Sequence, residues 1–146
     1  MTPENLLIVA DSERDANMLY AAGLLVPDPF IYLRIRGKCH LVLNDLEIDR
    51  ARRSVRHCRI IRLSAYVRKL RRDGMHPVSL GRVISAILRE RRLKKIVVPG
   101  NFPLALAREL RDLKIKVKAK DGSFFAEREV KTAEEIKKIN ALDRRT

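Results

Sequence analysis

The segment from Ser79 to Lys120 constrains the fold more than any other part of the chain. Apolar residues at helical spacing (Leu80, Val83, Ile84, Ile87 and Leu88) predict an amphipathic helix that Ser79 caps. A strand is predicted at Lys95–Val98, then a helix from Pro103 to about Leu113, then a strand in which lysines alternate with apolar residues, as suits a sheet edge. Helix, strand, helix and strand with short connections indicate a parallel β-α-β crossover.

The first third of the chain adds antiparallel pairing to that sheet. The apolar run Leu6–Ala10 predicts a buried strand, and Ser12 is placed to cap a helix that ends at Gly23. Phe30–Ile35 and Cys39–Leu43 are strand-like runs on either side of a glycine turn, so they predict a hairpin.

The middle of the chain continues the alternation of helices and strands. Asp45 is placed to cap a helix through about Val55, Arg59–Leu63 predicts a strand, and Ser64 is placed to cap a helix that ends near Gly74. Together these elements predict an α/β domain with a mixed, mostly parallel sheet and helices on both faces.

The positive charge of the chain is confined to one segment. The formal net charge is +14, from 32 basic and 18 acidic residues. Between Arg50 and Lys95 there are 16 basic and two acidic residues, so the rest of the chain is balanced. This distribution excludes a uniformly basic chain and indicates a balanced fold with one basic segment.

Length and composition indicate an ordinary cytoplasmic protein. The 146 residues suit one domain, and an apolar content of 46% argues against disorder. No apolar run reaches the ~20 residues of a membrane span, and no basic region of a signal peptide precedes the first apolar run. Two cysteines do not make a disulfide framework, so we expect reduced thiols.

Two pairs of residues, Cys39-His40 and His57-Cys58, have side chains that can bind zinc. Neighbouring residues on a strand point to opposite faces of the sheet, so Cys39 and His40 should not aim at one ion. Zinc sites also usually space paired ligands about two to four residues apart. We therefore expect core or surface roles for these residues and no metal site.

Three acids, Asp11, Asp45 and Glu47, lie near predicted strand ends. A nuclease of the ribonuclease H-like kind would need such carboxylates to hold two metal ions. Helix caps and first helical turns also favour acids, and we prefer that interpretation. The turn Pro99-Gly100-Asn101 has too few glycines for a phosphate-binding loop, and no known nucleophile or metal motif occurs, so no catalytic residue is predicted.

The basic segment predicts an exposed surface. Arginines of the Ser79 helix lie opposite its apolar stripe, and others form a dense run from Arg50 to Arg59. Tyr66 is the only aromatic residue in the segment, which argues against stacking on single-stranded nucleic acid. A contact with another protein surface is preferred. The candidate basic surface consists of Arg52, Arg53, Arg56, Arg82, Arg89 and Arg92.

Three stretches, taken in order, carry a family pattern. They are Asp15-Ala-Asn17-Met-Leu-Tyr20-Ala-Ala-Gly23 followed by Pro27-Asp28-Pro29-Phe30, then Leu43–Ala51 with Glu47 inside it, then Arg128-Glu-Val-Lys-Thr-Ala-Glu-Glu-Ile136. In this order they resemble the N-terminal domain of the creatinase, prolidase and aminopeptidase P group of Xaa-Pro metallopeptidases. The third stretch is similar to the junction that leads into the catalytic domain, whereas Ala21-Ala22 departs from the usual Leu-Thr.

The resemblance implies an α/β domain of ribonuclease H-like topology at residues 1–131 and the start of a linker helix at residues 132–146. The family's catalytic domain follows that junction and holds two divalent metal ions (Mn, Co or Zn) with two Asp, one His and two Glu, none of which is matched in this chain. By the same resemblance, Asn17, Tyr20 and Phe30 would lie at the rim of the substrate cleft or at a subunit interface.

The expected function is that of the non-catalytic N-terminal domain of a Xaa-Pro dipeptidase- or aminopeptidase-like metallopeptidase, contributing to oligomerisation and to the cleft rim. Its expected partners are its own C-terminal catalytic domain and a second copy in a homodimer, with no membrane partner and no cofactor in this part. The alternative is a free-standing basic α/β domain that binds nucleic acid, which the sequence favours less.

Overall fold

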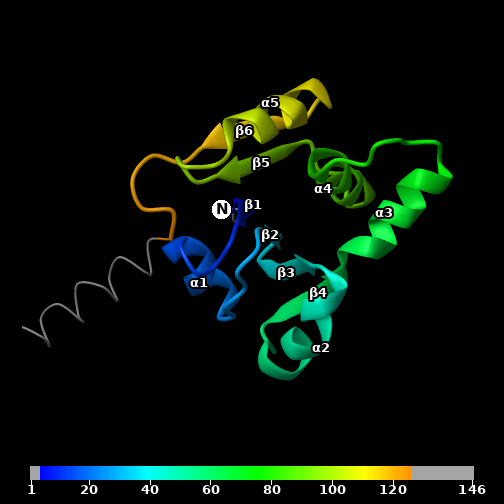
Figure 1. The fold of residues 1–146 in the computed structure, drawn as a ribbon. Coiled ribbons are helices and arrows are strands. Elements are labelled where there is room, and N and C mark those ends of the chain that lie inside the picture. Colours follow the sequence, from blue (N-terminus) through cyan, green and yellow to red (C-terminus); the bar gives the residue numbers. More distant parts are fainter. Residues whose placement is uncertain (1–3, 126–146) are drawn as a thin grey trace, which may run out of the picture.

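A six-stranded sheet forms the centre of the computed structural model, which describes residues 4–125. Its strands are β1 (Leu6–Ala10), β2 (Phe30–Ile35), β3 (Lys38–Leu43), β4 (Cys58–Arg62), β5 (Lys95–Val98) and β6 (Lys116–Ala119). They lie in the order β4-β3-β2-β1-β5-β6 (Figure 1). β2 pairs antiparallel with β1 and β3, and the other three pairings are parallel. The predicted mixed, mostly parallel sheet is confirmed, in agreement with the ribonuclease H-like topology that the resemblance implies.

Five helices cover the two faces of this sheet in the described residues. α1 (Ala16–Ala22) and α2 (Asp45–Ser54) pack on one face, and α3 (Leu63–Arg72), α4 (Leu80–Glu90) and α5 (Leu104–Asp112) lie on the other. The alternation of strand side chains explains why both faces need a cover: Leu6 and Ile8 point to the first face, and Leu7 and Val9 to the second.

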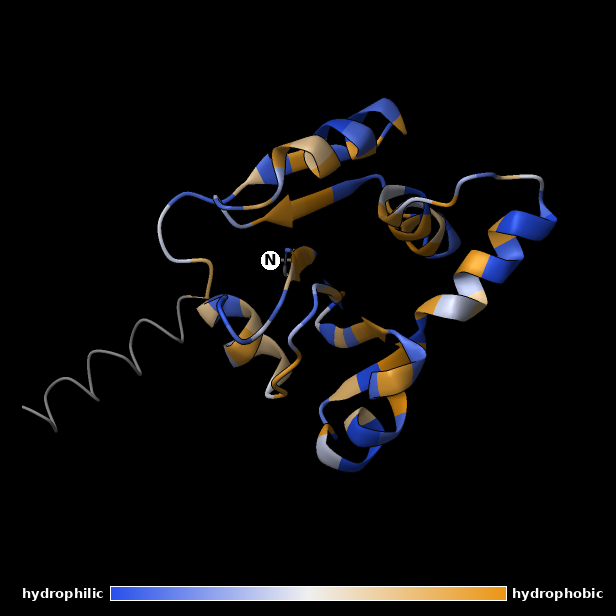
Figure 2. Ribbon diagram, in the orientation of Figure 1, coloured by the Kyte–Doolittle hydropathy of each residue, from blue (hydrophilic) through white to orange (hydrophobic). Residues whose placement is uncertain are grey.

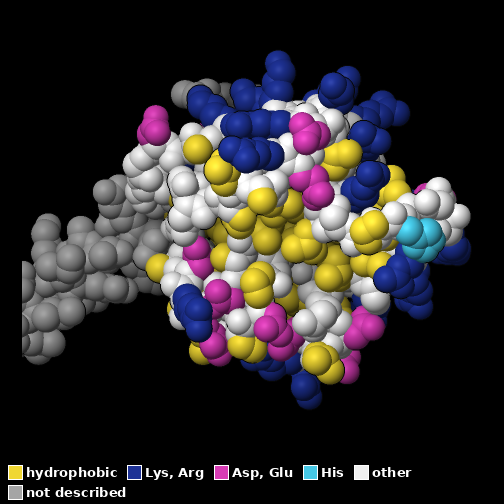
Figure 3. Space-filling view, turned by 45° about the horizontal axis from the view of Figure 1, so that its top comes forward, with side chains coloured by type: hydrophobic (Ala, Val, Ile, Leu, Met, Phe, Trp, Pro, Cys, Tyr) yellow, Lys and Arg dark blue, Asp and Glu magenta, His cyan; other side chains and the backbone are white. Residues whose placement is uncertain are grey.

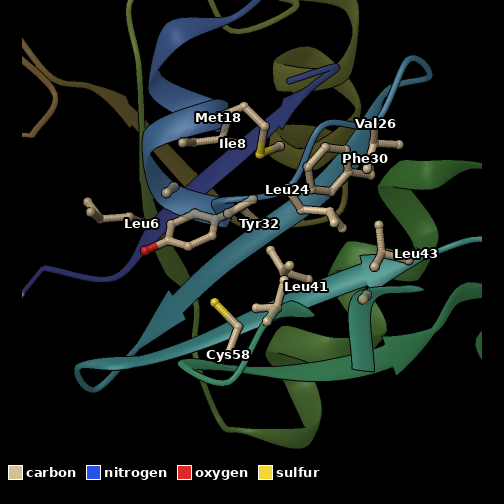
Figure 4. Packing of buried hydrophobic residues seen from close by; sticks show 14 of the residues in the cluster. Leu6, Ile8, Met18, Leu24, Val26, Phe30, Tyr32, Leu41, Leu43 and Cys58 are labelled. Carbon is tan, nitrogen blue, oxygen red and sulfur yellow. The ribbon is translucent and has the colours of Figure 1, made fainter. Parts of the chain in front are cut away.

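Each face has its own buried cluster. Figure 4 shows side chains of β1, β2 and β3 on the same side of the sheet as Met18 of α1, and all belong to the first buried cluster. On the second face, Ile84, Ile87 and Leu88 of α4 are fully buried against the sheet, as the periodicity of the Ser79 helix predicts. β5 lies between neighbours on both sides and is apolar for most of its length (Figure 2), whereas β6 alternates lysines with apolar residues at the sheet edge, as predicted.

α3 extends away from the sheet and is tied to α4 by polar contacts (Figure 1). The hydroxyl of Tyr66 donates to a carboxylate oxygen of Glu90 at 2.7 Å, and Lys69 donates to the other oxygen at 3.0 Å. One acid at the end of α4 therefore holds two side chains of α3.

Ser12 does not cap the first helix, contrary to our prediction. Asp15 is the N-cap, and its side chain accepts from the backbone N–H of Met18 at 2.8 Å. Ser12 is 1% exposed. Its hydroxyl donates to the carbonyl of Leu24 at 2.6 Å and accepts from the N–H of Val26 at 2.7 Å. Through these two hydrogen bonds, Ser12 links the loop after β1 to the loop before β2, where the backbone groups of Leu24 and Val26 have no strand partner. The predicted end of this helix at Gly23, which has a left-handed φ of 64°, is confirmed.

Two further predicted caps are also wrong. Asn44 caps α2 in place of Asp45, through its side-chain oxygen and the N–H of Glu47 at 3.2 Å. Ser64 lies inside the first turn of α3, where its hydroxyl donates to Asp45 at 2.8 Å, and Arg62 donates to the same oxygen. Side chains that the local sequence pattern predicts as helix caps thus form hydrogen bonds with residues distant in the sequence instead. Ser79, by contrast, caps α4 as predicted.

The two cysteines are paired, contrary to the expectation of reduced thiols. Cys39 on β3 and Cys58 on β4 are register partners in the parallel ladder and form a disulfide with a Cα–Cα distance of 4.5 Å. The pairing of β3 with β4 brings together residues that are 19 positions apart in the chain.

Three predictions lie outside the described residues. They are the helix that Thr132 would cap, the junction motif ending at Ile136 and the domain boundary after residue 131.

Candidate functional site

One end of the sheet gathers the loops that follow β1, β3 and β5. β1 is parallel to β5, and β2 runs antiparallel between β1 and β3, so the carboxyl ends of β1, β3 and β5 share this end with the start of β2. We call it the carboxyl-end face. In open α/β sheets this is the end at which ligands usually bind.

Four exposed leucines lie on the carboxyl-end face. Leu46 follows β3 and is 90% exposed, and Leu104 follows β5 and is 62% exposed. Leu25 precedes β2 and is also exposed. Leu80, which the helical pattern predicts in the core, is partly exposed and lines a small hollow of about 50 Å³ with Phe30 and other residues. Large exposed apolar patches usually mark interaction sites, so these four leucines are the candidate contact residues at this end of the sheet.

Charged side chains surround the exposed apolar side chains on one face of the molecule. Figure 3 shows a face of the molecule on which apolar side chains gather in the middle, with basic side chains above them and acidic side chains among and below them.

A polar crevice opens on the same end between the loops after β1 and β5. Its volume is about 260 Å³, and its lining includes Asp11, Arg14, Asp15, Asn101 and Phe102. Asn101 donates through its side-chain nitrogen to Asp15 at 3.1 Å, and Asp11 accepts from the N–H of Arg14 at 2.9 Å. The Asp11 carboxylate thus hydrogen-bonds to its own loop, and the Asp15 carboxylate hydrogen-bonds to the loop after β5. These contacts agree with a structural role for the Pro99-Gly100-Asn101 turn.

The three acids considered for a nuclease do not form a metal site. Asp45 is engaged by Arg62 and Ser64, and Glu47 pairs with Arg50 on its own helix. The hydrogen bonds from Ser64 and Arg62 lower the pKa of Asp45. Among residues 4–125, no group of three His, Cys, Asp or Glu side chains that could share an ion includes any of these acids. The nuclease hypothesis therefore has no support in the described part of the chain.

Charge is distributed unequally between the two ends of the sheet. The loops and first helical turns at the carboxyl end contain seven acids and four basic residues, namely Asp11, Glu13, Asp15, Asp28, Asp45, Glu47 and Asp121 with Arg14, Arg62, Arg82 and Lys120. The opposite end, which we call the amino end, contains Arg36, Lys38, Arg56, Arg91, Arg92, Lys94, Lys95, Lys114 and Lys116, against Glu4. The described part of the chain is thus acidic at one end of its strands and basic at the other.

The predicted basic surface is divided by the fold. Arg52, Arg53 and Arg56 lie at the end of α2 and just after it, whereas Arg89 and Arg92 lie at the end of α4, on the other face of the sheet. All five are exposed and lie towards the amino end. Arg82 is half-buried in the first turn of α4, near the carboxyl end. The six arginines therefore do not form one continuous patch.

The three predicted rim residues have different environments. Tyr20 is partly exposed, and its ring lies 5.2 Å from that of Phe125, which the Arg34 guanidinium also covers at 5.8 Å. Phe30 is buried in the first cluster, and Asn17 is half-buried on α1. A rim role for these residues stays a prediction. The exposed leucines, which sequence reasoning missed, are the clearer mark of a contact surface.

None of the described helices combines the length and apolar character that crossing a membrane requires.

Comparisons with known proteins give matches in structure and none in sequence. No protein-family model matches the chain, and no curated protein matches it. The X-Pro aminopeptidase from Thermotoga maritima is similar, with a TM-score of 0.61, 14% identity, and coverage of 81% of this chain and 31% of the enzyme. The prolidase from Pyrococcus furiosus has a TM-score of 0.56 at 12% identity, with coverage of 81% of this chain and 29% of the enzyme.

A third similar structure is a domain by itself. It is the creatinase/prolidase N-terminal domain of an X-Pro dipeptidase from Streptococcus pyogenes, with a TM-score of 0.53 and 12% identity. The match covers 80% of this chain and 81% of that domain, whereas the chain spans less than a third of the two enzymes above. The described part of the chain therefore has the fold of the creatinase/prolidase N-terminal domain.

Proposed function

We propose that this chain is the non-catalytic N-terminal domain of a Xaa-Pro dipeptidase- or aminopeptidase-like metallopeptidase. The observation that carries the proposal is the pattern of coverage, which is 81% of an isolated N-terminal domain and less than a third of the two enzymes. In the parent protein, a separate domain would hold two divalent metal ions that activate a water molecule for cleavage.

Within that protein, the carboxyl-end face is the surface that we assign to contact with the catalytic part, at the rim of its substrate cleft. Burial of a leucine side chain stabilises a contact by about 1.5–3 kcal/mol, so covering Leu46 and Leu104 would contribute substantially. If two copies of this chain met through their carboxyl-end faces, the acids of one copy would face those of the other. The catalytic part of the parent is therefore a better partner for this face than a second copy. Homodimerisation of the parent would then use other surfaces.

Two measurements test the proposal. The purified chain, assayed with Mn²⁺ or Co²⁺ and a Xaa-Pro peptide, is expected to release no product above the blank. An antibody raised against the chain is expected to detect, in the cells that make it, a polypeptide much larger than 16.8 kDa. Robust hydrolysis by the chain would refute its non-catalytic role, and a cellular polypeptide of 16.8 kDa would refute its place in a longer enzyme.

The docking surface has its own test in the intact protein. Leu46→Glu and Leu104→Glu should each lower peptidase activity or the melting temperature of the intact protein. Leu19→Glu is the matched control, because Leu19 is an exposed leucine inside α1 and is not one of the four leucines assigned to the carboxyl-end face. Equal effects of all three substitutions would remove the assignment of this face.

Nucleic-acid binding is a second candidate, and one observation favours it. The amino end of the sheet gathers lysines and arginines from several loops, which could neutralise phosphates. Binding of a labelled RNA or DNA duplex should then weaken steeply as salt rises, and Lys94→Glu with Lys95→Glu should weaken it further. Absence of binding at low salt would remove this candidate.

A further inference from the structure

A cysteine pair and a histidine meet on the first face of the sheet, away from the carboxyl-end face. The donor atoms of Cys39, His57 and Cys58 all lie within 4.8 Å of one another. Figure 4 shows the side chain of Cys58 on the side of the sheet where the first buried cluster lies. Cys58 is buried, Cys39 is half-buried and His57 is exposed, so the group lies where the core meets solvent.

Of the four possible zinc ligands in the sequence pairs Cys39-His40 and His57-Cys58, the fold brings three together and separates His40 from them. Cys39 and Cys58 point to the first face because they are register partners on β3 and β4. His40 follows Cys39 on the same strand, so its side chain points to the other face, as the alternation rule predicts. His57 precedes the first residue of β4, and therefore the rule does not separate it from Cys58.

His57 is held in an orientation that suits a metal ligand. Its Nε2 lies 2.9 Å from the carbonyl oxygen of Ala21. A carbonyl oxygen only accepts, so Nε2 carries the proton and the lone pair of the neutral ring is on Nδ1. Histidines that bind metals commonly donate their other ring N–H to a carbonyl or carboxylate in this way. The contact with Ala21 is thus an observation independent of the cysteines.

We propose that Cys39, Cys58 and His57 form a redox-gated site for one zinc ion, which binds when the disulfide is reduced. Two thiolates and one imidazole are ligands that zinc prefers, and three protein ligands leave a fourth position for water. Two thiolates also neutralise a divalent ion, which suits a partly buried site. With Zn–S bonds of ~2.3 Å, tetrahedral geometry needs the sulfurs about 3.8 Å apart, a spacing that side chains facing one another on adjacent strands can adopt.

The chemistry balances with a dithiol as reductant. The dithiol reduces the Cys39–Cys58 bond, giving two protein thiols and the oxidised, cyclic disulfide of the reductant. Zinc then binds the two sulfurs and Nδ1 of His57, and two protons leave the thiols. In the oxidised chain each sulfur is bonded to the other, so no thiolate remains for the ion.

Cobalt(II) is the probe that tests this proposal, because its tetrahedral thiolate complexes absorb visibly and zinc displaces it. The full chain is reduced, freed of reductant without oxygen and titrated with Co²⁺. We expect two titratable thiols after reduction, a sulfur-to-cobalt absorption band that saturates at one ion per chain, and loss of the band on addition of one equivalent of Zn²⁺. The untreated oxidised chain should give no band.

Matched variants separate the ligands from their neighbours. Cys39→Ser and Cys58→Ser should each abolish the two-thiolate spectrum, and His57→Ala should weaken Co²⁺ binding at least tenfold. His40→Gln should leave the spectrum unchanged, because His40 lies next to Cys39 on the opposite face. Circular dichroism of each reduced variant shows whether it is folded, and only folded variants are compared.

Three results would overturn the proposal. The first is a reduced, folded wild-type chain that gives no thiolate band with Co²⁺, which would leave the pair as a disulfide alone. The second is an unchanged affinity in His57→Ala, which would exclude the histidine. The third is equal binding by the oxidised chain, which would exclude the redox gate.

Discussion

Replacement of Ser12 by alanine should destabilise the fold far more than its position in a surface loop suggests. The hydroxyl of Ser12 is the hydrogen-bond partner of the Leu24 carbonyl and of the Val26 N–H, at 2.6 and 2.7 Å. Both partner residues are at most 5% exposed, so water cannot readily replace the lost group. A buried polar group left without a partner costs about 1–3 kcal/mol, so we expect Ser12→Ala to lower the free energy of unfolding by about 2–4 kcal/mol.

Urea unfolding followed by far-ultraviolet circular dichroism measures this change, with the disulfide kept intact in every sample. For a chain of this length, about 3 °C of melting temperature corresponds to 1 kcal/mol, which gives a decrease of about 6–12 °C. Ser64→Ala is the matched control, since its hydroxyl meets only the exposed Asp45, and it should change stability by no more than about 0.5 kcal/mol. If Ser12→Ala and Ser64→Ala were equally stable, the two loops would not depend on the Ser12 hydroxyl.

Two further predictions concern the buried histidine and the second core. Acidification below about pH 6.5 should lower the free energy of unfolding, because burial, and then the charges of Arg91 and Arg59, lower the pKa of His40 in the folded chain, so the unfolded chain takes up the proton first. The stability that neutral His40 contributes is complete above its pKa in the unfolded chain and is lost as pH falls through its pKa in the folded chain. Urea titrations at several pH values should therefore show that acidification lowers the free energy of unfolding less in His40→Gln than in the wild type. Ile87→Ala should cost about 2–5 kcal/mol because Ile87 is fully buried, whereas Leu104→Ala on the carboxyl-end face should change the stability of the isolated chain by less than about 0.5 kcal/mol; similar values for the two in urea unfolding would contradict the assignment of core and surface.

The elements of the fold could be predicted because their signals are local. The helix of residues 80–90 and the strands β1, β2 and β5 follow from apolar periodicity and length, which a single sequence contains. The caps at Ser12, Asp45 and Ser64 were predicted by the same local reasoning and are wrong. Each of these side chains has a partner that is at least 12 residues away, and spacing along the chain carries no information about such a partner.

The candidate sites could be predicted only in part, because they depend on strand order. The alternation rule correctly separates Cys39 from His40, but the meeting of Cys39 with Cys58 requires the parallel register of β3 and β4. One feature of the sequence could have indicated the exposed leucines. Leu46, Leu80 and Leu104 each lie in the first turn of a helix, within two residues of its N-cap.

The separation of acidic and basic groups along the strands makes the described part of the chain an electric dipole as well as a cation. A partner surface with a basic rim would turn this molecule before contact, so that the acidic end arrives first and the leucines meet the partner in a productive orientation. Added salt should then slow association while leaving dissociation nearly unchanged, because the field acts at a distance and the leucines act only after contact. The loops after β1, β3 and β5 would thus set the speed of encounter through their charges and the lifetime of the complex through their apolar side chains.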